Sequence, residues 1–456
     1  MLRRFKPLAG LPFSWLLVAL LAGCAGPQPP VASLPASPVV ATGVHHVAVV
    51  DAGSSGSRLF LYRVQQQGGA LRIDATYSTR DVPHALSWYD GTHGPGSAPV
   101  QAGPQGVGPL LAGLRQAAQR QGLPPDSITV HALATAGLRL VAPDAARDIH
   151  ASVRQAIESQ GFRVGAVGTI SGQQEGLYSW ADVNHLLGRF ERDEPTLGIV
   201  EVGGASAQVA FAVPGAQAGA ETGAATVPVT VQGRRYSVFS VSYLGLGQNE
   251  ARQAMLQAGG GAAPCYPAGA VPGPGDAVRT RRVAGAGSGA GSNGEAFSLA
   301  GCARAFAPVL AKAGGAHGDD GVALAQVRQL PGFAQTRFAG ISAVHYAFKD
   351  WSLAPDVAPG AVLAQTLEHQ CSGGVEAVAK VKQSFRNPVA FFQQHACAHG
   401  AYIHEFLFSA GGLGLDSPGS AGPQLLPLGS IAGQELNWTR GVVVLEGALQ
   451  GMLAGH

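Results

Sequence analysis

The segment that most constrains the fold is Asp51-Ala-Gly-Ser-Ser-Gly-Ser-Arg58, which lies between two short apolar runs. The runs His46–Val50 and Leu59–Tyr62 are typical of buried β-strands, so the segment between them is predicted to form the tight turn of a hairpin. Its glycines let the backbone approach a ligand closely, and its hydroxyls and successive N–H groups can form an anion-binding nest. Asp51, at the strand end, is placed to hold a cation or its water shell. For one such segment alone, an ordinary Gly/Ser turn without a ligand is the alternative.

The same pattern returns 150 residues later in the chain, counted from Asp51 to Glu201. There a strand is predicted over Thr196–Val202, a turn over Gly203–Gln208 and a returning strand over Val209–Val213. An apolar strand, an acidic residue, a Gly/Ser turn and a second apolar strand therefore occur twice. This internal duplication predicts two cradles, one in each lobe, that face each other across a cleft and grip a polyphosphate from both sides.

Two further segments place polar side chains at the ends of predicted strands. The strand Ile128–Leu133 runs into the small-residue turn Ala134–Arg139 and a helix over Asp144–Gln160, which makes a βα unit. Thr135 would lie at the carboxyl end of that strand, the edge at which open α/β sheets bind ligands. Without a ligand, Thr135 would only lead into the helix.

A second strand, Val164–Thr169, is followed by a helix that begins near Glu175. A carboxylate at a helix N-terminus is electrostatically favoured whatever the function, so this position alone is not a sign of catalysis. Later in the chain, the aromatic segment Phe338–Phe348 is predicted to be a strand. A final helix is predicted over Gly441–Leu453.

Composition places the chain among globular proteins with two or three domains, because it has 456 residues of which 46% are hydrophobic and only 13% are charged. The formal net charge is +2, and no Lys/Arg cluster occurs beyond the N-terminus. We therefore expect no nucleic-acid partner.

The N-terminus is predicted to be a targeting segment. Met1–Lys6 is basic, and Leu8–Leu21 is apolar but broken by Pro12 and too short for a comfortable membrane span. The sequence Leu21-Ala-Gly-Cys24 resembles a bacterial lipobox, which implies a signal peptide over 1–23, a lipidated Cys24 and a Pro/Ala-rich tether over 24–43. The chain would then be exported and anchored through lipid to the cell envelope, at the outer membrane on its periplasmic or surface side. An ordinary secretory signal with a chance cysteine is the alternative.

Four cysteines remain after Cys24, and an even number in an oxidising compartment predicts two disulfides. Proximity in the sequence favours Cys265–Cys302 and Cys371–Cys397 among the three possible pairings. A zinc site is the alternative, but the wide spacings do not resemble paired C-x₂-C knuckles.

Taken in chain order, these segments resemble the motifs of the nucleoside triphosphate diphosphohydrolases, or apyrases. The four main matches are Asp51–Arg58, Ala134–Arg139, Ser171–Trp180 and Glu201–Gln208. Further matches cover most of the remaining chain: Ser242–Gly247 with Ala251 and Arg252, Pro264–Pro267, Ser342–Phe348, and Trp438 with Gly441. The resemblance implies an α/β, two-lobed actin-like (ribonuclease H-like) fold with the active site in the interlobe cleft. Lobe I would comprise residues 44–170 and 432–456, and lobe II residues 171–431.

The resemblance also implies a reaction, the metal-dependent hydrolysis of nucleoside tri- and diphosphates such as ATP and ADP to lower phosphates and inorganic phosphate. Glu175 would be the general base that orients and deprotonates the attacking water, which Ser206 and Gln208 would help to hold. Ca²⁺ or Mg²⁺ would bridge the phosphates, with its waters steadied by Asp51, Thr135, Glu201 and Trp438. Tyr346 is a candidate to stack on the base, with an ordinary core tyrosine of a strand as the alternative. The phosphate-binding residues would be Ser54, Ser55, Gly56, Ser57, Arg58, Gly203, Gly204 and Ala205.

One position departs from the family pattern, because the fourth motif usually begins with Asp and here begins with Glu201. The exopolyphosphatases and guanosine pentaphosphate phosphohydrolases, a related branch, resemble the Glu-x-Gly-Gly form and supply the alternative enzyme. The matches at Trp180, Pro264-Cys265 and Trp438 favour the apyrase. An inactive exported nucleotide-binding module is a third possibility, against which the intact Glu175, Ser206 and Gln208 argue.

Overall fold

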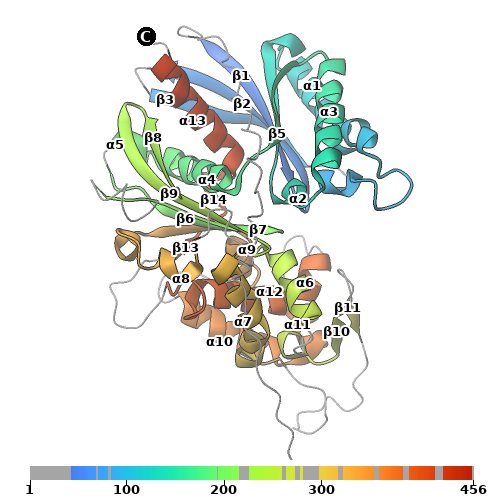
Figure 1. Cartoon of the computed structure of the whole chain (residues 1–456), viewed down its shortest axis with the longest axis vertical. Helices are drawn as coiled ribbons and strands as arrows, with labels where there is room; N and C mark the ends of the chain where they lie inside the picture. The colour runs from blue at the N-terminus through green and yellow to red at the C-terminus, as the bar shows by residue number, and fades with distance from the viewer. Residues whose placement is uncertain are drawn as a thin grey trace, which may run out of the picture. The chain divides into compact units, whose positions relative to one another are not determined.

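The computed structural model describes residues 43–67, 70–80, 84–192, 194–214, 225–258, 263–272, 278–280, 297–316, 322–353, 359–383, 390–415 and 425–453. The predicted signal peptide, Cys24 and all but the last residue of the predicted tether lie outside the described residues. Two large β-sheets and their helices make up most of the described chain, which we call the first and the second sheet (Figure 1).

The first sheet has the strand order β3-β2-β1-β4-β5. An antiparallel meander, β1 to β3, forms one side, and two strands parallel to β1 form the other. Because side chains alternate along a strand, β1 turns Val49 and Asp51 toward one face and Val50 and Ala52 toward the other. The strands are β1 (Val44–Gly53), β2 (Gly56–Gln67), β3 (Ala70–Thr79), β4 (Ile128–Ala134) and β5 (Arg163–Thr169).

The second sheet repeats this plan. Its order is β13-β12-β6-β7-β9-β8, in which β6, β7 and β9 form an antiparallel meander and β12 and β13 run parallel to β6. The predicted duplication of one turn is therefore a duplication of five strands, with β8 added at the edge. The strands are β6 (Gly198–Val202), β7 (Ser206–Ala212), β8 (Thr226–Val231), β9 (Arg234–Leu244), β12 (Phe338–Ser342) and β13 (Leu425–Pro427).

Two helices cover the outer face of the first sheet, α1 (Gly108–Arg120) and α3 (Pro143–Ser159) (Figure 1). Each buries one stripe of apolar residues against Val50 and Leu59 of the sheet, as helical periodicity predicts. The short helix α2 (Ala136–Arg139) follows β4 directly. The buried residues of the two long helices are Leu110, Leu111, Leu114, Ile149, Val153 and Ile157.

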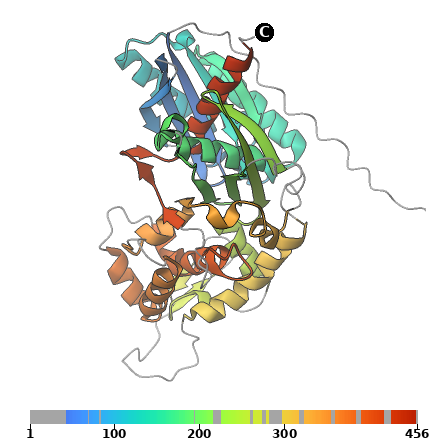
Figure 2. The same ribbon diagram turned by 90° about the vertical axis from the view of Figure 1, so that its left-hand side faces the viewer.

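Two other helices, α4 (Gly172–Leu186) and α13 (Trp438–Leu453), lie between the two sheets (Figure 2). One apolar cluster joins Phe60 of the first sheet, Trp180 and Val442 of the two helices, and Val238 of the second sheet. Helix α4 begins with a capping box, in which the Ser171 hydroxyl and the Gln174 side chain each accept a backbone N–H of the other residue. This cap fixes the turn of α4 that carries Glu175.

The contact between α4 and α13 is both close and polar. Gly441 packs so tightly on α4 that a Cβ there would lie 1.8 Å from the carbonyl oxygen of Tyr178. Arg440 donates to Asp182 over 2.5 Å, and both side chains are only 1% exposed. The Asn437 backbone N–H donates to the second carboxylate oxygen over 2.9 Å, and the Tyr62 hydroxyl donates to the Asn437 side chain. The network therefore ties both helices to β2 of the first sheet.

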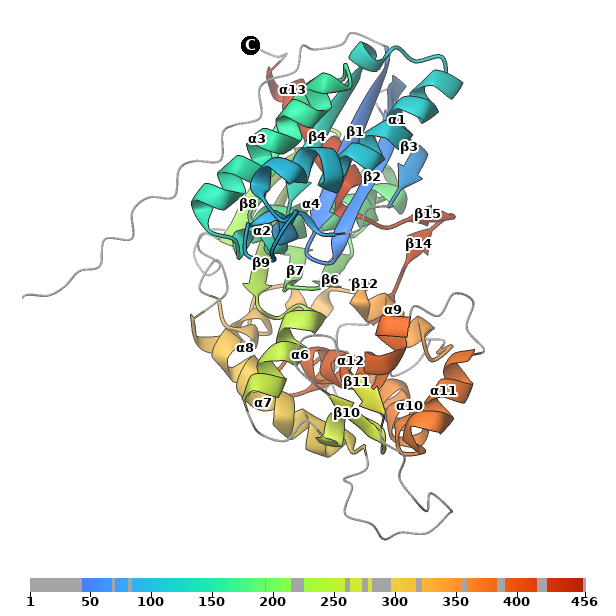
Figure 3. The same ribbon diagram turned by 90° about the vertical axis from the view of Figure 1, so that its right-hand side faces the viewer.

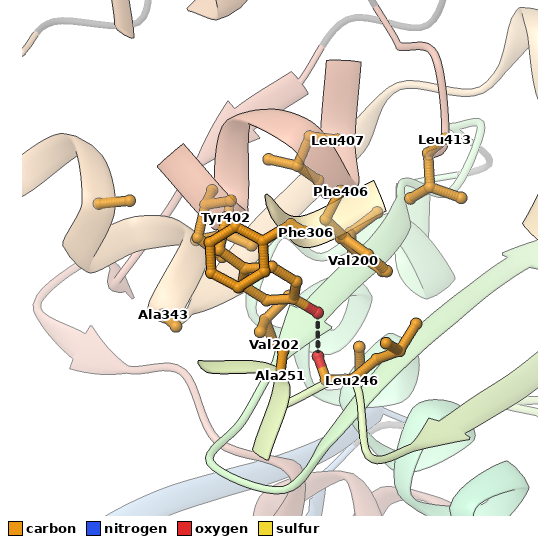
Figure 4. Close-up of a cluster of buried hydrophobic side chains, with 14 of the residues drawn as sticks. Val200, Val202, Leu246, Ala251, Phe306, Ala343, Tyr402, Phe406, Leu407 and Leu413 are labelled. Atoms are coloured by element: carbon orange, nitrogen blue, oxygen red, sulfur yellow. Dashed lines mark hydrogen bonds between the residues drawn. The ribbon is translucent and has the colours of Figure 1, made fainter. Parts of the chain in front are cut away.

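Helix α5 (Arg189–Arg192) also belongs to the cluster between the sheets, into which it packs Phe190. The remaining helices pack on the far side of the second sheet, and this core includes the two disulfides, Cys265–Cys302 and Cys371–Cys397. Both are the pairs that sequence proximity favours. Near the sheet, Tyr402 donates its hydroxyl to the Leu246 carbonyl, which fixes the turn between β9 and α6 (Figure 4). The helices on this side are α6 (Gln248–Gln257), α7 (Leu299–Ala316), α8 (Leu324–Val327), α9 (Ala343–Lys349), α10 (Pro359–Cys371), α11 (Gly374–Gln383) and α12 (Ala390–Phe408).

Two small antiparallel pairs complete the described strands, β10 (Ala270–Pro272) with β11 (Val278–Thr280) and β14 (Ser430–Ile431) with β15 (Gln434–Glu435). The predicted lobe boundaries fall between β5 and α4 and within the β14–β15 hairpin. Within the described ranges, no helix is both long enough and apolar enough to cross a membrane.

The structure corrects several sequence-based boundaries. The returning strand begins at Ser206 and not at Val209, so Ser206 and Gln208 lie in β7 and not in the predicted turn. Phe338–Phe348 is not one strand, because β12 ends at Ser342 and α9 begins at Ala343. A short run of apolar and aromatic residues fits either element, and here a sharp turn at Ser342 separates them. The final helix begins at Trp438, three residues before the predicted Gly441.

The close contact of α4 with α13 makes Gly441→Ala a test of how the sheets are joined. We expect the added methyl to lower the free energy of unfolding by about 3 kcal/mol, the upper end of overpacking effects, because it meets backbone that cannot rotate away. Urea unfolding measures this loss. Gly168→Ala in β5 is the matched control, since its Cβ would meet no atom within 4 Å. Equal unfolding midpoints for the two variants would contradict the expected role of the contact.

Candidate functional site

The two Gly/Ser turns face each other. Ser54 and Ser55 form the turn between β1 and β2, and Gly203 to Ala205 form the turn between β6 and β7. A Cβ on Gly204 would lie 2.5 Å from the hydroxyl oxygens of both Ser54 and Ser55. The first sheet's turn therefore lies directly opposite the second sheet's turn, at the neighbouring ends of the β1–β2 and β6–β7 hairpins (Figure 3).

The N-terminus of α6 braces the second turn. The backbone N–H groups of Gln248 and Asn249 donate to the carbonyls of Gly203 and Gly204 over 2.9 and 3.0 Å. In a planar trans peptide the carbonyl and the following N–H point in opposite directions. The N–H groups of Gly204 and Ala205 therefore point away from α6, and they are fixed before any ligand arrives. Preorganised N–H donors of this kind suit a phosphate or another anion.

Asp51 belongs to a chain of four charges. Arg58, its cross-strand partner, donates through Nε over 3.2 Å and through Nη2 over 2.6 Å to the same carboxylate oxygen, Oδ2. The other end of Arg58 lies 3.4 Å from Glu435 of the β14–β15 hairpin, and Arg80 also binds Glu435. Asp51 is 3% exposed, whereas the outer pair faces solvent. Arg58 thus shares its charge between a buried and an exposed carboxylate.

Glu201 is held by two serine hydroxyls. Ser179 of α4 donates to Oε2 over 2.5 Å, and Ser342 at the end of β12 donates to Oε1 over 2.9 Å. Burial raises the pKa of Glu201 and nearby Asp51 raises it further, while the two serine hydrogen bonds and Arg58 lower it. The interaction with Asp51 shows that the two acidic residues of the duplicated pattern converge.

Glu175, Ser206 and Gln208 form one hydrogen-bonded cluster. Gln208 Nε2 lies 3.1 Å from Glu175 Oε2, 2.7 Å from Ser206 Oγ and 3.0 Å from Ser242 Oγ. Arg139 of α2 donates to Glu175 Oε2 over 2.5 Å and reaches Ser206 over 3.4 Å. Glu175 is 7% exposed, so this cluster is a buried, charge-compensated group at the N-terminal turn of α4.

The other predicted site residues lie at different distances from the facing turns. Thr135 is close to Asp51, because its N–H donates to the carbonyl of Ala52, the residue after Asp51. Ser57, by strand alternation, faces the opposite side of the first sheet from Asp51 and is 1% exposed. Trp438 stacks on Tyr178, whose neighbour Ser179 holds Glu201, with 6.5 Å between ring centroids. Gly56 begins β2, beside the turn that Ser54 and Ser55 form.

Tyr346 is not a core strand residue but a helical residue that is 48% exposed. It lies at a hollow lined also by Trp351, His399 of α12 and Gln248 of α6. Since the N–H of Gln248 braces the second turn, the hollow adjoins the candidate phosphate cradle. Burial lowers the pKa of His399 well below its ordinary value, which keeps that imidazole neutral at pH 7.

The oxygen donors of Asp51, Thr135 and Glu201 fit a hard divalent cation such as Ca²⁺ or Mg²⁺. In the part of the chain that the structure describes, no three His, Cys, Asp or Glu side chains gather closely enough to ligate a metal ion together. The two carboxylates are instead tied to Arg58 and to serines, an arrangement suited to water molecules around a cation.

Several residues of the site were not identified from the sequence as its members. Arg139 lies in a predicted motif, but it contacts Glu175, a residue of another helix that is 36 positions away in the chain. Ser242 lies directly opposite Gln208 in the β7–β9 register, a pairing that a sequence pattern does not specify. Ser179 and Ser342 reach Glu201 from a helix and from another strand. These contacts depend on tertiary register, which local sequence does not encode.

The family relationship follows from a comparison with known protein families. The sequence model of the GDA1/CD39 (nucleoside phosphatase) family matches residues 39–449 of this chain. The chain belongs to the GDA1/CD39 nucleoside phosphatase family. The duplicated turns and the Glu175 cluster are thus features of a member of this family.

Individual members of the GDA1/CD39 family match over part of their length. A nucleoside-triphosphatase of Pisum sativum is 32% identical over 228 residues, 46% of this chain and 47% of that protein. A nucleoside-triphosphatase of Caenorhabditis elegans is 30% identical over 218 residues, 45% and 39% of the two proteins. Human ectonucleoside triphosphate diphosphohydrolase 2 is 29% identical over 241 residues, 48% and 46% of the two proteins. The chain spans less than half the length of these relatives.

Solved structures identify the fold. A nucleoside triphosphate hydrolase of Neospora caninum has a TM-score of 0.53 at 15% identity, over 90% of this chain and 93% of that one. An exopolyphosphatase-like protein has a TM-score of 0.50 at 11% identity, over 90% and 99%. At such identities the likeness concerns the fold alone. The two duplicated sheets form the two-lobed actin-like fold that the family resemblance implies.

The facing turns generate a prediction for this GDA1/CD39 member. Gly204→Ala would place a methyl 2.5 Å from two serine hydroxyls that can rotate away, so we expect the free energy of unfolding to change by less than about 0.5 kcal/mol. The methyl would nevertheless fill the space between the turns, and we expect at least about a tenfold loss of affinity for ADP with Mg²⁺, which is about 1.4 kcal/mol. Isothermal titration calorimetry measures the affinity.

Gly203→Ala is the matched control, because its Cβ would meet its nearest atom, the Ser206 carbonyl oxygen, at an ordinary 3.4 Å. We expect this variant to bind ADP like the wild type. If both variants bound ADP equally well, the space between the turns would not be the phosphate site.

Proposed function

We propose that this chain hydrolyses nucleoside tri- and diphosphates to lower phosphates and inorganic phosphate, with a divalent cation and a water activated by Glu175. One observation carries the proposal: Glu175, Ser206 and Gln208 converge in one hydrogen-bonded cluster beside two facing Gly/Ser turns. Membership of a nucleoside phosphatase family supports the same reaction.

One group of residues binds the phosphate, and a second group binds the attacking water. The N–H groups of Gly204 and Ala205, with the hydroxyls of Ser54 and Ser55, bind the oxygens of the terminal phosphate. Ser206 and Gln208 hold the water in line, and Glu175 takes its proton. Arg139, now paired with Glu175, supplies positive charge beside the phosphate, where negative charge spreads over three oxygens in the transition state.

Ca²⁺ or Mg²⁺, when bound, would neutralise charge on the phosphate chain. Asp51, Thr135 and Glu201 would accept hydrogen bonds from its waters, and Trp438 would close that shell with its ring. Both Arg58 hydrogen bonds go to Asp51 Oδ2. Asp51 Oδ1 lies near the turn, 3.8 Å from where a Cβ on Gly53 would be. The exposed ring of Tyr346 would stack on the base.

An exopolyphosphatase or guanosine pentaphosphate phosphohydrolase is the second candidate, and Glu201 is the observation that favours it. Its longer side chain matches the Glu-x-Gly-Gly form of that branch. The matches at Trp180, Pro264-Cys265 and Trp438 favour the nucleotidase.

We also propose that the chain is exported and lipidated at Cys24. The lipobox-like sequence before Cys24 supports this location, and so do the two disulfides, which persist in oxidising compartments.

Substitution of Glu175 tests the mechanism. We expect Glu175→Gln to lower kcat for ATP by about 10²–10⁴-fold, because the amide cannot accept a proton, while a non-hydrolysable ATP analogue still binds. Glu158→Gln on the exposed face of α3 is the control and should keep full activity. Phosphate release from ATP, ADP and polyphosphate, with Ca²⁺, Mg²⁺ or EDTA, is the measurement. Full activity of Glu175→Gln would exclude this base, and release from polyphosphate alone would select the second candidate.

Arg58 offers a test of the cation site. Without the charge of Glu435, Arg58 would pair with Asp51 alone and would compete with the cation for the charge of that carboxylate. We expect Glu435→Gln to raise the Mg²⁺ concentration for half-maximal ATP hydrolysis by about two- to fivefold, a small effect because the outer pair is solvent-exposed. Arg80→Gln frees Glu435 for Arg58 and should lower that concentration. A change in the same direction for both variants would argue against shared use of Arg58.

A further inference from the structure

Ser342 has an unusual backbone conformation. It ends β12 and precedes α9 with φ 56° and ψ −124°. Side chains with a Cβ are disfavoured there, because the region is one that glycine adopts at no steric cost. The turn itself is tight, since a Cβ on Gly340 would lie 2.4 Å from Val344 Cγ1. A sharp strand-to-helix turn explains the backbone, but it does not explain a serine where glycine would be relaxed.

The hydroxyl of Ser342 supplies the missing explanation. It donates to Glu201 Oε1 over 2.9 Å, while Ser179 donates to Oε2. Glu201 is 8% exposed and has three side-chain torsions to order, and each carboxylate oxygen is fixed by one hydroxyl. A glycine at 342 would remove the strain and also release one end of this carboxylate.

The duplicated fold points to the same residue. β12 lies beside β6 as β4 lies beside β1, and the residues that follow or end these two strands are Thr135 and Ser342. Each is a hydroxyl residue at a strand-to-helix junction, next to the strand that carries Asp51 or Glu201. The same turn begins α9, whose Ala343 and Tyr346 line the hollow beside the second turn.

We infer that Ser342 is a positioning residue, whose strained backbone is kept because it delivers a hydroxyl to Glu201 and so fixes that carboxylate toward the cation's waters. The inference rests on the proposed function for the identity of the ligand. Mg²⁺ demands near-ideal octahedral geometry, so a carboxylate held at both oxygens serves it better than a mobile one.

The test separates strain from hydrogen bonding. Ser342→Ala keeps the strain and loses the hydroxyl, whereas Ser342→Gly loses both. At a position with negative φ the alanine variant would be the more stable of the two. Because φ is positive at Ser342, we expect the reverse order, with a higher urea midpoint for Ser342→Gly than for Ser342→Ala. Ser352, another serine with positive φ (54°), is the matched control for strain and should show the same order.

The second measurement is the affinity for a non-hydrolysable ATP analogue with Mg²⁺ and with EDTA. The ratio of the two affinities reports the coupling between cation and nucleotide. We expect about a tenfold smaller ratio in Ser342→Ala, Ser342→Gly and Ser179→Ala, and an unchanged ratio in both Ser352 variants. A purely structural defect would weaken both affinities and leave the ratio unchanged.

Two results would overturn the inference: a wild-type ratio in Ser342→Gly, or a lower urea midpoint for Ser342→Gly than for Ser342→Ala. Failure of the proposed function looks different. A wild-type protein that binds the analogue in a Mg²⁺-dependent way but releases no phosphate from ATP would remove the hydrolase proposal alone, since neither measurement requires turnover.

Discussion

The close crossing of α4 and α13 is the constraint on which the rest of the site depends. Gly441 lets the helices touch, and the buried Asp182–Arg440 pair sets which turns meet. A buried ion pair contributes little net stability, because both ions lose their water, but its loss from one side leaves an uncompensated charge. Since α4 carries both Glu175 and Ser179, a slip of one turn would move the base and the anchor of Glu201 together.

The two sheets present an acidic residue at the same place and stabilise it differently. Asp51 is neutralised by a guanidinium that also reaches solvent-exposed Glu435, whereas Glu201 accepts two neutral hydroxyls. The first site compensates charge with charge, and the second with dipoles. The duplication thus gave two equivalent carboxylates, and the surrounding residues made them electrostatically unequal.

The repeated strand-turn-strand pattern predicted the two hairpins and their facing turns, because strand periodicity and Gly/Ser turns are local properties. The segment Phe338–Phe348 was predicted wrongly for the same reason, since a serine gives no local sign of the positive φ that ends β12. The two-lobed actin-like fold itself was implied only by the family resemblance. The cluster at Glu175 was predicted only through the family resemblance. The contacts of Arg139 and Ser242 with this cluster could not be predicted from the sequence, because sheet register and helix placement bring the two residues to Glu175 and Gln208.

The placement of the cross-links has a mechanical consequence. Both disulfides join elements on the far side of the second sheet, and they use every cysteine of the chain except Cys24. No cysteine is left in either sheet or in α4 and α13 to bond one lobe to the other. Movement of one lobe past the other would therefore strain no disulfide. The helix crossing, the Tyr62 network and the hairpin that carries Glu435 resist such movement.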